Sequence, residues 1–321
     1  MSALTEFGLI RRYFSRPTDQ AVLGVGDDAA LLQPSPGCWL AVSTDTLVAG
    51  VHFFADAEPE ALGWKALAVN LSDMAAMGAD PRWVTLALTL PVLSDDWLAA
   101  FAAGWYACAG AFGASLVGGD TTRGPLSIGV TVLGEVPVGQ ALRRDGAQVG
   151  DEIWVSGTLG DAALALAARQ GRLQLDLADE AALAGRLDKP QPRVALGKAL
   201  RGLAHSAIDL SDGLLADLGH VAERSGVAAV LDSGTLPLSD AARRQRGYSG
   251  LIDCVLAGGD DYELCFTAAP SAAAEIVRQA AALGVAVCRI GRIEAGNGVQ
   301  VHDAAGRPMN TGRTGYDHFA A

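Results

Sequence analysis

The chain has 321 residues, of which 50% are hydrophobic and 19% are charged. This balance is typical of a folded globular protein and excludes a disordered chain. The length exceeds what one hydrophobic core usually supports, so we expect about two domains. Acidic residues outnumber lysine and arginine by 36 to 24, which gives a formal net charge of −12. Such an acidic surface repels phosphate backbones, so we expect no nucleic-acid partner.

Neither the cysteines nor the start of the chain indicates export. The first residues lack the apolar core and the small-residue cleavage site of a signal peptide. The cysteines are odd in number and form neither a C-x-x-C pair nor a zinc-ligand spacing. Reduced thiols in a cytoplasmic protein are therefore the expectation. The five positions are Cys38, Cys108, Cys254, Cys265 and Cys288.

The first part of the chain alternates between strand and helix patterns. The uncharged segment 97–119 is long enough to span a membrane. It is dominated by alanine and glycine and has no flanking basic cluster, so we predict a buried helix that runs into a buried strand, with no membrane association. The predicted elements are a strand at 39–48, a helix at 60–77 ended by Gly78 and Pro81, a strand at 83–90, a helix from about Asp95, and strands at 114–119 and 126–136.

Turns and charges dominate residues 139–157, where we place the domain boundary. The two predicted domains are 1–138 and 139–321. The second repeats the alternation, with a strand at 153–157, helices near 161–170 and after Pro192, a strand at 206–210 and a helix at 213–224. Mixed strands and helices of this kind predict an α/β or α+β fold in each half.

Most candidate functional residues in the sequence are aspartates. Most of them end an apolar strand or lie in a glycine turn, which is where α/β sheets build binding crevices. Asp73 lies instead among apolar neighbours in a helix, where an unpaired carboxylate costs several kcal/mol, and Asn70 one turn earlier would share its face. The others are Asp27, Asp28, Asp45, Asp120, Asp209, Asp212, Asp260 and Asp261.

Carboxylates that converge cannot all ionise without cations, so bound divalent metal is the expected counter-charge. Oxygen ligands without a histidine or cysteine cluster favour Mg²⁺, which usually bridges carboxylates to substrate phosphates. The sequence therefore favours a nucleotide site in spite of its net negative charge. A purely structural role at a turn or helix cap stays open for Asp27 and for Asp212 taken singly.

Two familiar nucleotide motifs do not fit. The segment GVGDDA at 24–29 matches a dinucleotide fingerprint, but Pro34 and Pro36 leave no room for the helix that must follow. A P-loop is absent, because Gly197 and Lys198 are followed by alanine. Among the histidines, His52 is the one close to an acidic motif, and contact with a ligand and a structural role are equally open for it.

Seven blocks in order resemble the thiamine-monophosphate kinase family. They are GVGDDAA, STDTLVAGVHF, KALAVNLSDMAAMGADP, LVGGDTTRGPL, AIDLSDGLLADLGH, GGDDYEL and GYDHF, and they cover nearly the whole chain. The resemblance implies the two-domain architecture shared with aminoimidazole ribonucleotide synthetase and selenophosphate synthetase. In it an N-terminal β-sheet with helices forms a barrel in a homodimer, and the C-terminal domain is an α/β sandwich. ATP would lie between the metal aspartates and the glycine-rich strand ends.

The resemblance also implies a role for individual residues. Where relatives carry glutamate at the first acid of GGDDYEL, this chain has the shorter Asp260. The implied Mg²⁺ ligands are Asp28, Ser43, Thr44, Asp45, Asp73, Asp120, Asp209 and Asp212; the implied ATP contacts are Tyr106, Gly119, Asp120, Arg144 and Ser211; and the implied substrate contacts are His52, Asp260 and Tyr316.

The implied reaction is transfer of the γ-phosphoryl group of ATP to thiamine monophosphate, the final step of thiamine diphosphate synthesis. The acceptor is a phosphate oxygen that is already anionic, since a phosphomonoester has a second pKa of about 6. No general base is therefore needed, and we assign none. Two alternatives stay open: an aminoimidazole ribonucleotide synthetase-like enzyme that uses ATP for ring closure, and a non-catalytic nucleotide-binding maturation scaffold.

Overall fold

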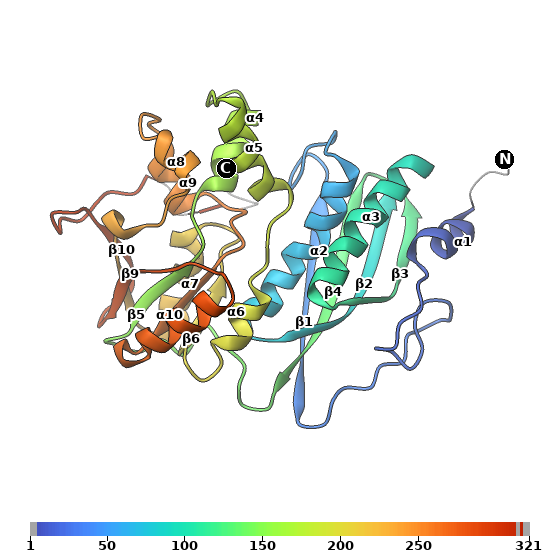
Figure 1. Ribbon diagram of the computed structural model, residues 1–321, viewed down its shortest axis with the longest axis horizontal. Coiled ribbons are helices and arrows are strands. Elements are labelled where there is room, and N and C mark those ends of the chain that lie inside the picture. The colour runs from blue at the N-terminus through green and yellow to red at the C-terminus, as the bar shows by residue number, and fades with distance from the viewer. Residues whose placement is uncertain (1–4, 313–314, 317–321) are drawn as a thin grey trace. The chain divides into compact units, whose positions relative to one another are not determined.

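The computed structural model describes residues 5–312 and 315–316. They divide into two compact units, Met1–Met74 with Ala79–Gly139, and Ala75–Gly78 with Gln140–Ala321. Each unit contains one sheet with helices packed on it, seen in blue to green and in green to red in Figure 1. The predicted mixture of helices and sheets in each half is confirmed.

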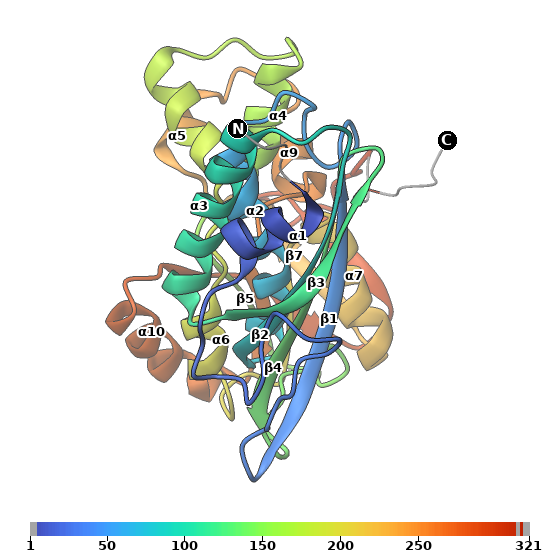
Figure 2. The same ribbon diagram turned by 90° about the vertical axis from the view of Figure 1, so that its right-hand side faces the viewer.

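The first unit is a four-stranded sheet in the order β1-β4-β2-β3, in which only β2 and β3 run parallel. Helices α2 and α3 lie on the same side of this sheet (Figure 2). The elements of the unit are α1 (Glu6–Leu9), the π-helix η1 (Ile10–Phe14), β1 (Cys38–Val48), α2 (Pro59–Ala76), β2 (Asp80–Leu90), α3 (Asp95–Phe112), β3 (Ser115–Arg123) and β4 (Ser127–Pro137).

The uncharged segment forms a helix and then a strand, as its composition predicts. Helix α3 begins after Ser94, whose hydroxyl accepts from the amide of Trp97, and it ends at Gly113 in the left-handed conformation. Phe101 and Trp105 are fully buried along it, and β3 follows at once. No helix in the described part of the chain is long and apolar enough to cross a membrane.

The second unit is a six-stranded mixed sheet in the order β10-β7-β9-β5-β8-β6. Helix α5 was not predicted, although its sequence is rich in alanine and leucine and Asp176 caps its start. The elements are β5 (Glu152–Ser156), α4 (Asp161–Arg169), α5 (Leu177–Asp188), α6 (Val194–Ala199), β6 (Ser206–Asp209), α7 (Leu214–Ser225), β7 (Ala228–Asp232), η2 (Ser233–Thr235), α8 (Asp240–Arg244), α9 (Leu251–Ala257), β8 (Leu264–Ala268), η3 (Pro270–Ala272), α10 (Ala273–Ala282), β9 (Val287–Glu294) and β10 (Gly298–His302).

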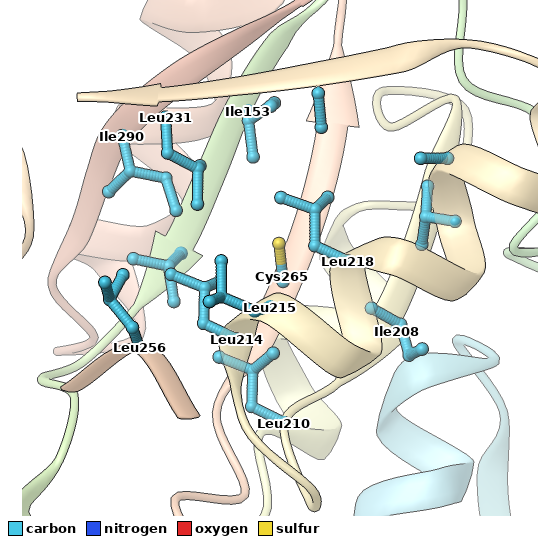
Figure 3. Packing of buried hydrophobic residues seen from close by; sticks show 14 of the residues in the cluster. Ile153, Ile208, Leu210, Leu214, Leu215, Leu218, Leu231, Leu256, Cys265 and Ile290 are labelled. Atoms are coloured by element: carbon cyan, nitrogen blue, oxygen red, sulfur yellow. The ribbon is translucent and has the colours of Figure 1, made fainter. Parts of the chain in front are cut away.

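The core of the second unit fixes the start of α7. Figure 3 shows Leu214 and Leu218 of this helix pointing toward Ile153, Leu231 and Cys265 of the sheet. Burial of each leucine side chain stabilises the fold by about 1.5–3 kcal/mol. The first turn of α7 follows the acidic turn after β6 directly, so this packing holds the acidic turn at a defined place.

Candidate functional site

In the first unit, strand β1 and helix α2 bring four polar residues together. The hydroxyl of Ser43 donates to a carboxylate oxygen of Asp73 at 2.5 Å, and the amide of Asp45 donates to the side-chain oxygen of Asn70 at 3.1 Å. Asn70 is fully buried and also donates to the carbonyl of Ala66 at 3.0 Å. Ser43 and Asp45 face α2 together because alternate residues of a strand share a face. The prediction that Asn70 and Asp73 share one helix face is confirmed.

Thr44 lies on the opposite face of β1, where its hydroxyl pairs with that of Thr131 at 2.9 Å. Asp120 of β3 is exposed and stands opposite Ala87 of β2. Strands β1 and β3 are the two edges of the sheet, with β4 and β2 between them. At about 4.8 Å per strand, the backbones of Asp45 and Asp120 are roughly 14 Å apart. The implied metal ligands of this unit therefore fall into separate groups rather than one cage.

Gly119, one of the implied ATP contacts, packs closely against the neighbouring strand. Its φ is 151°, and an added Cβ would lie 1.9 Å from the carbonyl oxygen of Leu86 on the neighbouring strand. Only glycine allows this approach, and the exposed carboxylate of Asp120 follows it immediately. The glycine thereby sets where β3 presents Asp120.

The remaining implied residues of this unit come from three other segments. The imidazole Nδ1 of His52 accepts from the amide of Val48 at 3.0 Å, which places a ring proton on Nε2. The ring of Tyr106 on α3 is covered by the guanidinium of Arg16, centred 3.5 Å from it, and burial raises the pKa of Tyr106 to about 12. Asp28 is exposed in the loop before β1.

In the second unit, the acidic turn follows strand β6. Asp209 is the last residue of β6 and is 4% exposed. The amides of Asp212 and Gly213 both donate to one carboxylate oxygen of Asp217, at 3.1 Å each. Burial, and then the charges of Asp209 and Asp212, raise the pKa of Asp217 to about 8. Three carboxylates thus lie close together at the start of α7.

Two further segments attach to this turn through backbone hydrogen bonds. The amide of Asp260 donates to the carbonyl of Ser211 at 2.9 Å, and the amide of Tyr316 donates to the carbonyl of Asp212 at 3.0 Å. The Tyr316 side chain is 52% exposed. The structure therefore brings together Ser211, Asp212, Asp260 and Tyr316, which come from three distant parts of the chain. Arg144 is exposed in the loop before β5, where its carbonyl accepts from the hydroxyl of Ser225 at 2.9 Å.

The carboxylate and hydroxyl oxygens described in each unit are suitable ligands for a hard cation. Carboxylate and hydroxyl oxygens are the ligands that Mg²⁺ prefers, and it usually takes one or two carboxylates and completes its shell with water and phosphate oxygens. Within residues 5–312 and 315–316, no group of three or more histidine, cysteine, aspartate or glutamate side chains is arranged to hold a metal ion by itself. The residues fit a cation that arrives with a phosphate ligand.

Two family models match the chain in order. The model of the N-terminal domain of AIR synthase related proteins matches residues 26–136, and the model of the C-terminal domain matches residues 148–304. Thiamine-monophosphate kinase of Escherichia coli strain K12 is 48% identical over 322 residues, which cover 99% of each chain. The chain belongs to the thiamine-monophosphate kinase family.

Solved structures of the family have the same fold. The crystal structure of thiamine-monophosphate kinase from Stenotrophomonas maltophilia K279a superposes with a TM-score of 0.85 at 55% identity, and covers 91% of this chain and 93% of its own. The structure of AaThiL complexed with AMPPCP and TMP superposes with a TM-score of 0.78 at 33% identity, over 99% and 98% of the two chains. The predicted aminoimidazole ribonucleotide synthetase-like architecture is therefore confirmed.

Sequence reasoning assigned no site role to three buried acids of the second unit, although it had named Asp261 among the aspartates of interest. Asp217 lies inside a block that carries the family resemblance, yet it looks like an ordinary first-turn acid of a helix. Asp261 and Glu263 follow the acid singled out in GGDDYEL, and they are 6% and 0% exposed. The burial of these acids follows from tertiary packing, so no pattern in the sequence could have shown it.

Proposed function

We propose that the chain phosphorylates thiamine monophosphate with ATP and releases thiamine diphosphate and ADP. The observation that carries this proposal is its 48% identity, over 99% of both chains, to a curated enzyme of that name. The structure of AaThiL complexed with AMPPCP and TMP supports the choice of the two substrates.

The site residues take the roles that the family resemblance gives them. Residues 1–138 provide ATP and metal binding together with the dimer surface, and residues 139–321 provide the other nucleotide contacts and those to thiamine monophosphate. The proposed Mg²⁺ ligands are Asp28, Ser43, Thr44, Asp45, Asp73, Asp120, Asp209 and Asp212. ATP contacts Tyr106, Gly119, Asp120, Arg144 and Ser211, and the acceptor contacts His52, Asp260 and Tyr316.

Transfer is direct and in line. An anionic oxygen of thiamine monophosphate forms a bond to the γ-phosphorus of ATP while the bond from that phosphorus to the β–γ bridging oxygen breaks, and ADP leaves. Bound Mg²⁺ supplies charge screening between the two phosphate groups. The residues of the chain position the reactants: the exposed Tyr316 ring stacks on the acceptor, and the charge of Asp260 complements the cationic thiazolium.

The open face of the four-stranded sheet supports a homodimer. Leu40 and Val42 of β1 are 45% and 60% exposed on the face away from α2, where Thr44 also lies. Apolar side chains on an edge strand are a liability in a free monomer and suit pairing with a second copy. We place the dimer in the cytoplasm, in keeping with five cysteines that are free thiols.

Incubation of the purified chain with ATP, Mg²⁺ and thiamine monophosphate tests the proposal. Thiamine diphosphate, measured by chromatography, should form in step with ADP. Release of ADP only with an aminoimidazole ribonucleotide synthetase substrate would replace the proposed acceptor, and tight ATP binding without any product would favour the maturation scaffold.

A variant of the Ser43–Asp73 pair tests the metal assignment. Asp73→Asn should lower kcat by about 100-fold or more, because it removes a charge that acts on the phosphates, and should leave the unfolding temperature near that of the wild type. Asp96→Asn is the matched control, since Asp96 is an exposed acid in the first turn of α3. Full turnover by Asp73→Asn would remove Asp73 from the metal site.

A further inference from the structure

The loop 258–262 between α9 and β8 has an unusual backbone. Asp260 and Tyr262 have φ values of 69° and 47°, and they are the only residues other than glycine with positive φ in the described part of the chain. This left-handed conformation is unfavourable for residues with a side chain, so neighbouring contacts must hold it. In such places the strain usually serves a binding or catalytic site.

Asp261 lies between these two residues, and its side chain is buried. It is 6% exposed, and its two carboxylate oxygens accept from the amide of Gly160 at 3.1 and 2.9 Å. Gly160 precedes helix α4, whose N-terminus favours a negative charge. Asp261 therefore ties the middle of the loop to a helix that is 100 positions away in the sequence.

The loop 258–262 packs closely against the residues that follow β6. The amides of Asp260 and Tyr262 donate to the carbonyls of Ser211 and Leu210 at 2.9 and 2.8 Å. An added Cβ on Gly259 would lie 2.4 Å from the carbonyl oxygen of Ser211. The phenol of Tyr262 donates to a carboxylate oxygen of Asp260 at 3.1 Å. The direction of the Asp260 carboxylate thus depends on how the loop is held.

We propose that Asp261 is a positioning residue for acceptor binding, which holds the loop 258–262 so that Asp260 is presented beside Ser211 and Asp212. This inference rests on the proposed function, because that function assigns Asp260 to the acceptor. Asp261 itself contacts neither substrate. Its loss should therefore weaken binding of thiamine monophosphate much more than binding of ATP.

Asp261→Ala and Asp261→Asn in the full-length chain test this role. Asp261→Ala should raise KM for thiamine monophosphate by about tenfold and KM for ATP by less than about twofold. Asp261→Asn keeps one oxygen that can accept from Gly160, so KM for thiamine monophosphate should return to within about threefold of the wild type. If Asp261→Ala does not fold, Asp261→Ser replaces it, since its hydroxyl is too short to reach Gly160.

Hydrogen exchange gives a second measurement that needs no substrate. In Asp261→Ala the amides of Asp260 and Tyr262 should exchange at least about tenfold faster, while those of helix α7 keep the wild-type rate. Asp151→Ala is the matched control, because Asp151 is also buried in this unit, 3% exposed, but bonds His205 and the amide of Gln148 at a site away from the loop. It should leave both KM values and the loop exchange unchanged.

Unchanged loop exchange in Asp261→Ala, or an equal rise of both KM values with faster exchange throughout the unit, would overturn the inference. If the wild-type chain made no thiamine diphosphate, the proposed function would fail. The exchange rates would then decide separately whether Asp261 holds the loop.

Discussion

Glu263 is a buried charge in the second unit, and its replacement tests how much its contacts contribute to the free energy of unfolding. Its side chain is 0% exposed. It accepts a hydrogen bond from Ser156 at 2.5 Å, two from Arg193 at 2.6 and 2.5 Å, and one from Arg186. Burial lowers the pKa of Arg193, but the hydrogen bond and charge of Glu263 outweigh it and leave that pKa raised. The carboxylate and the two guanidinium groups therefore depend on each other.

Glu263→Gln keeps the shape of the side chain and removes its charge. The guanidinium groups of Arg186 and Arg193, whose side chains are 24% and 20% exposed, then lose the negative charge of Glu263. Breaking a buried pair from one side costs about 3–5 kcal/mol, and we expect a loss of this size in the free energy of unfolding. The partly exposed guanidinium groups of Arg186 and Arg193 can turn toward water, so we expect a loss at the lower end of this range.

Urea unfolding followed by far-UV circular dichroism measures this loss. Glu275→Gln is the matched control, because Glu275 pairs with Arg278 at the surface and exposed pairs contribute little. A loss below about 1 kcal/mol for Glu263→Gln would refute the reasoning, since it would mean that the guanidinium groups are satisfied without the carboxylate.

Two further predictions concern a proposed ATP contact, Gly119, and a buried acid that binds the turn after β6, Asp217. Gly119→Ala should lower kcat/KM for ATP by about tenfold or more, because its Cβ would meet the carbonyl of Leu86 at 1.9 Å, and wild-type steady-state kinetics in this variant would contradict it. In metal-free buffer, Asp217→Asn should be more stable than the wild type at high pH. The pKa of Asp217 is raised from 3.8 to about 8, so the folded protein loses stability as pH rises toward 8. The advantage of the variant should grow by roughly 3 kcal/mol between about pH 5.5 and about pH 8.5, and a constant difference in urea unfolding would argue against this pKa.

The sequence predicted most elements of the fold because their signals are local. Residues 60–77 were expected as a helix ended by glycine, and α2 spans Pro59–Ala76. Residues 213–224 were expected as a helix, and α7 spans Leu214–Ser225. Helix α5 was missed although its signals are also local: Asp176 caps it, and its buried residues Asp179, Leu183 and Leu187 recur every fourth position.

The candidate site was predictable in its residue types but not in its grouping. That Asn70 and Asp73 share a face follows from helical spacing. That Asp45 and Asp120 stand at opposite edges of the sheet depends on the strand order β1-β4-β2-β3, which no local pattern determines. The left-handed backbone at Asp260 and Tyr262 arises from contacts with segments far along the chain, which a local pattern does not report.

Two main-chain hydrogen bonds help to attach Asp260 and Tyr316 to the turn after β6. A main-chain hydrogen bond does not require a particular side chain, although the left-handed backbone at Asp260 limits which residues fit there. On the side of the turn, these two bonds use the carbonyls of Ser211 and Asp212 and not their side chains. A substitution at either of the two proposed acceptor residues would therefore leave the main chain of the turn tied to both segments.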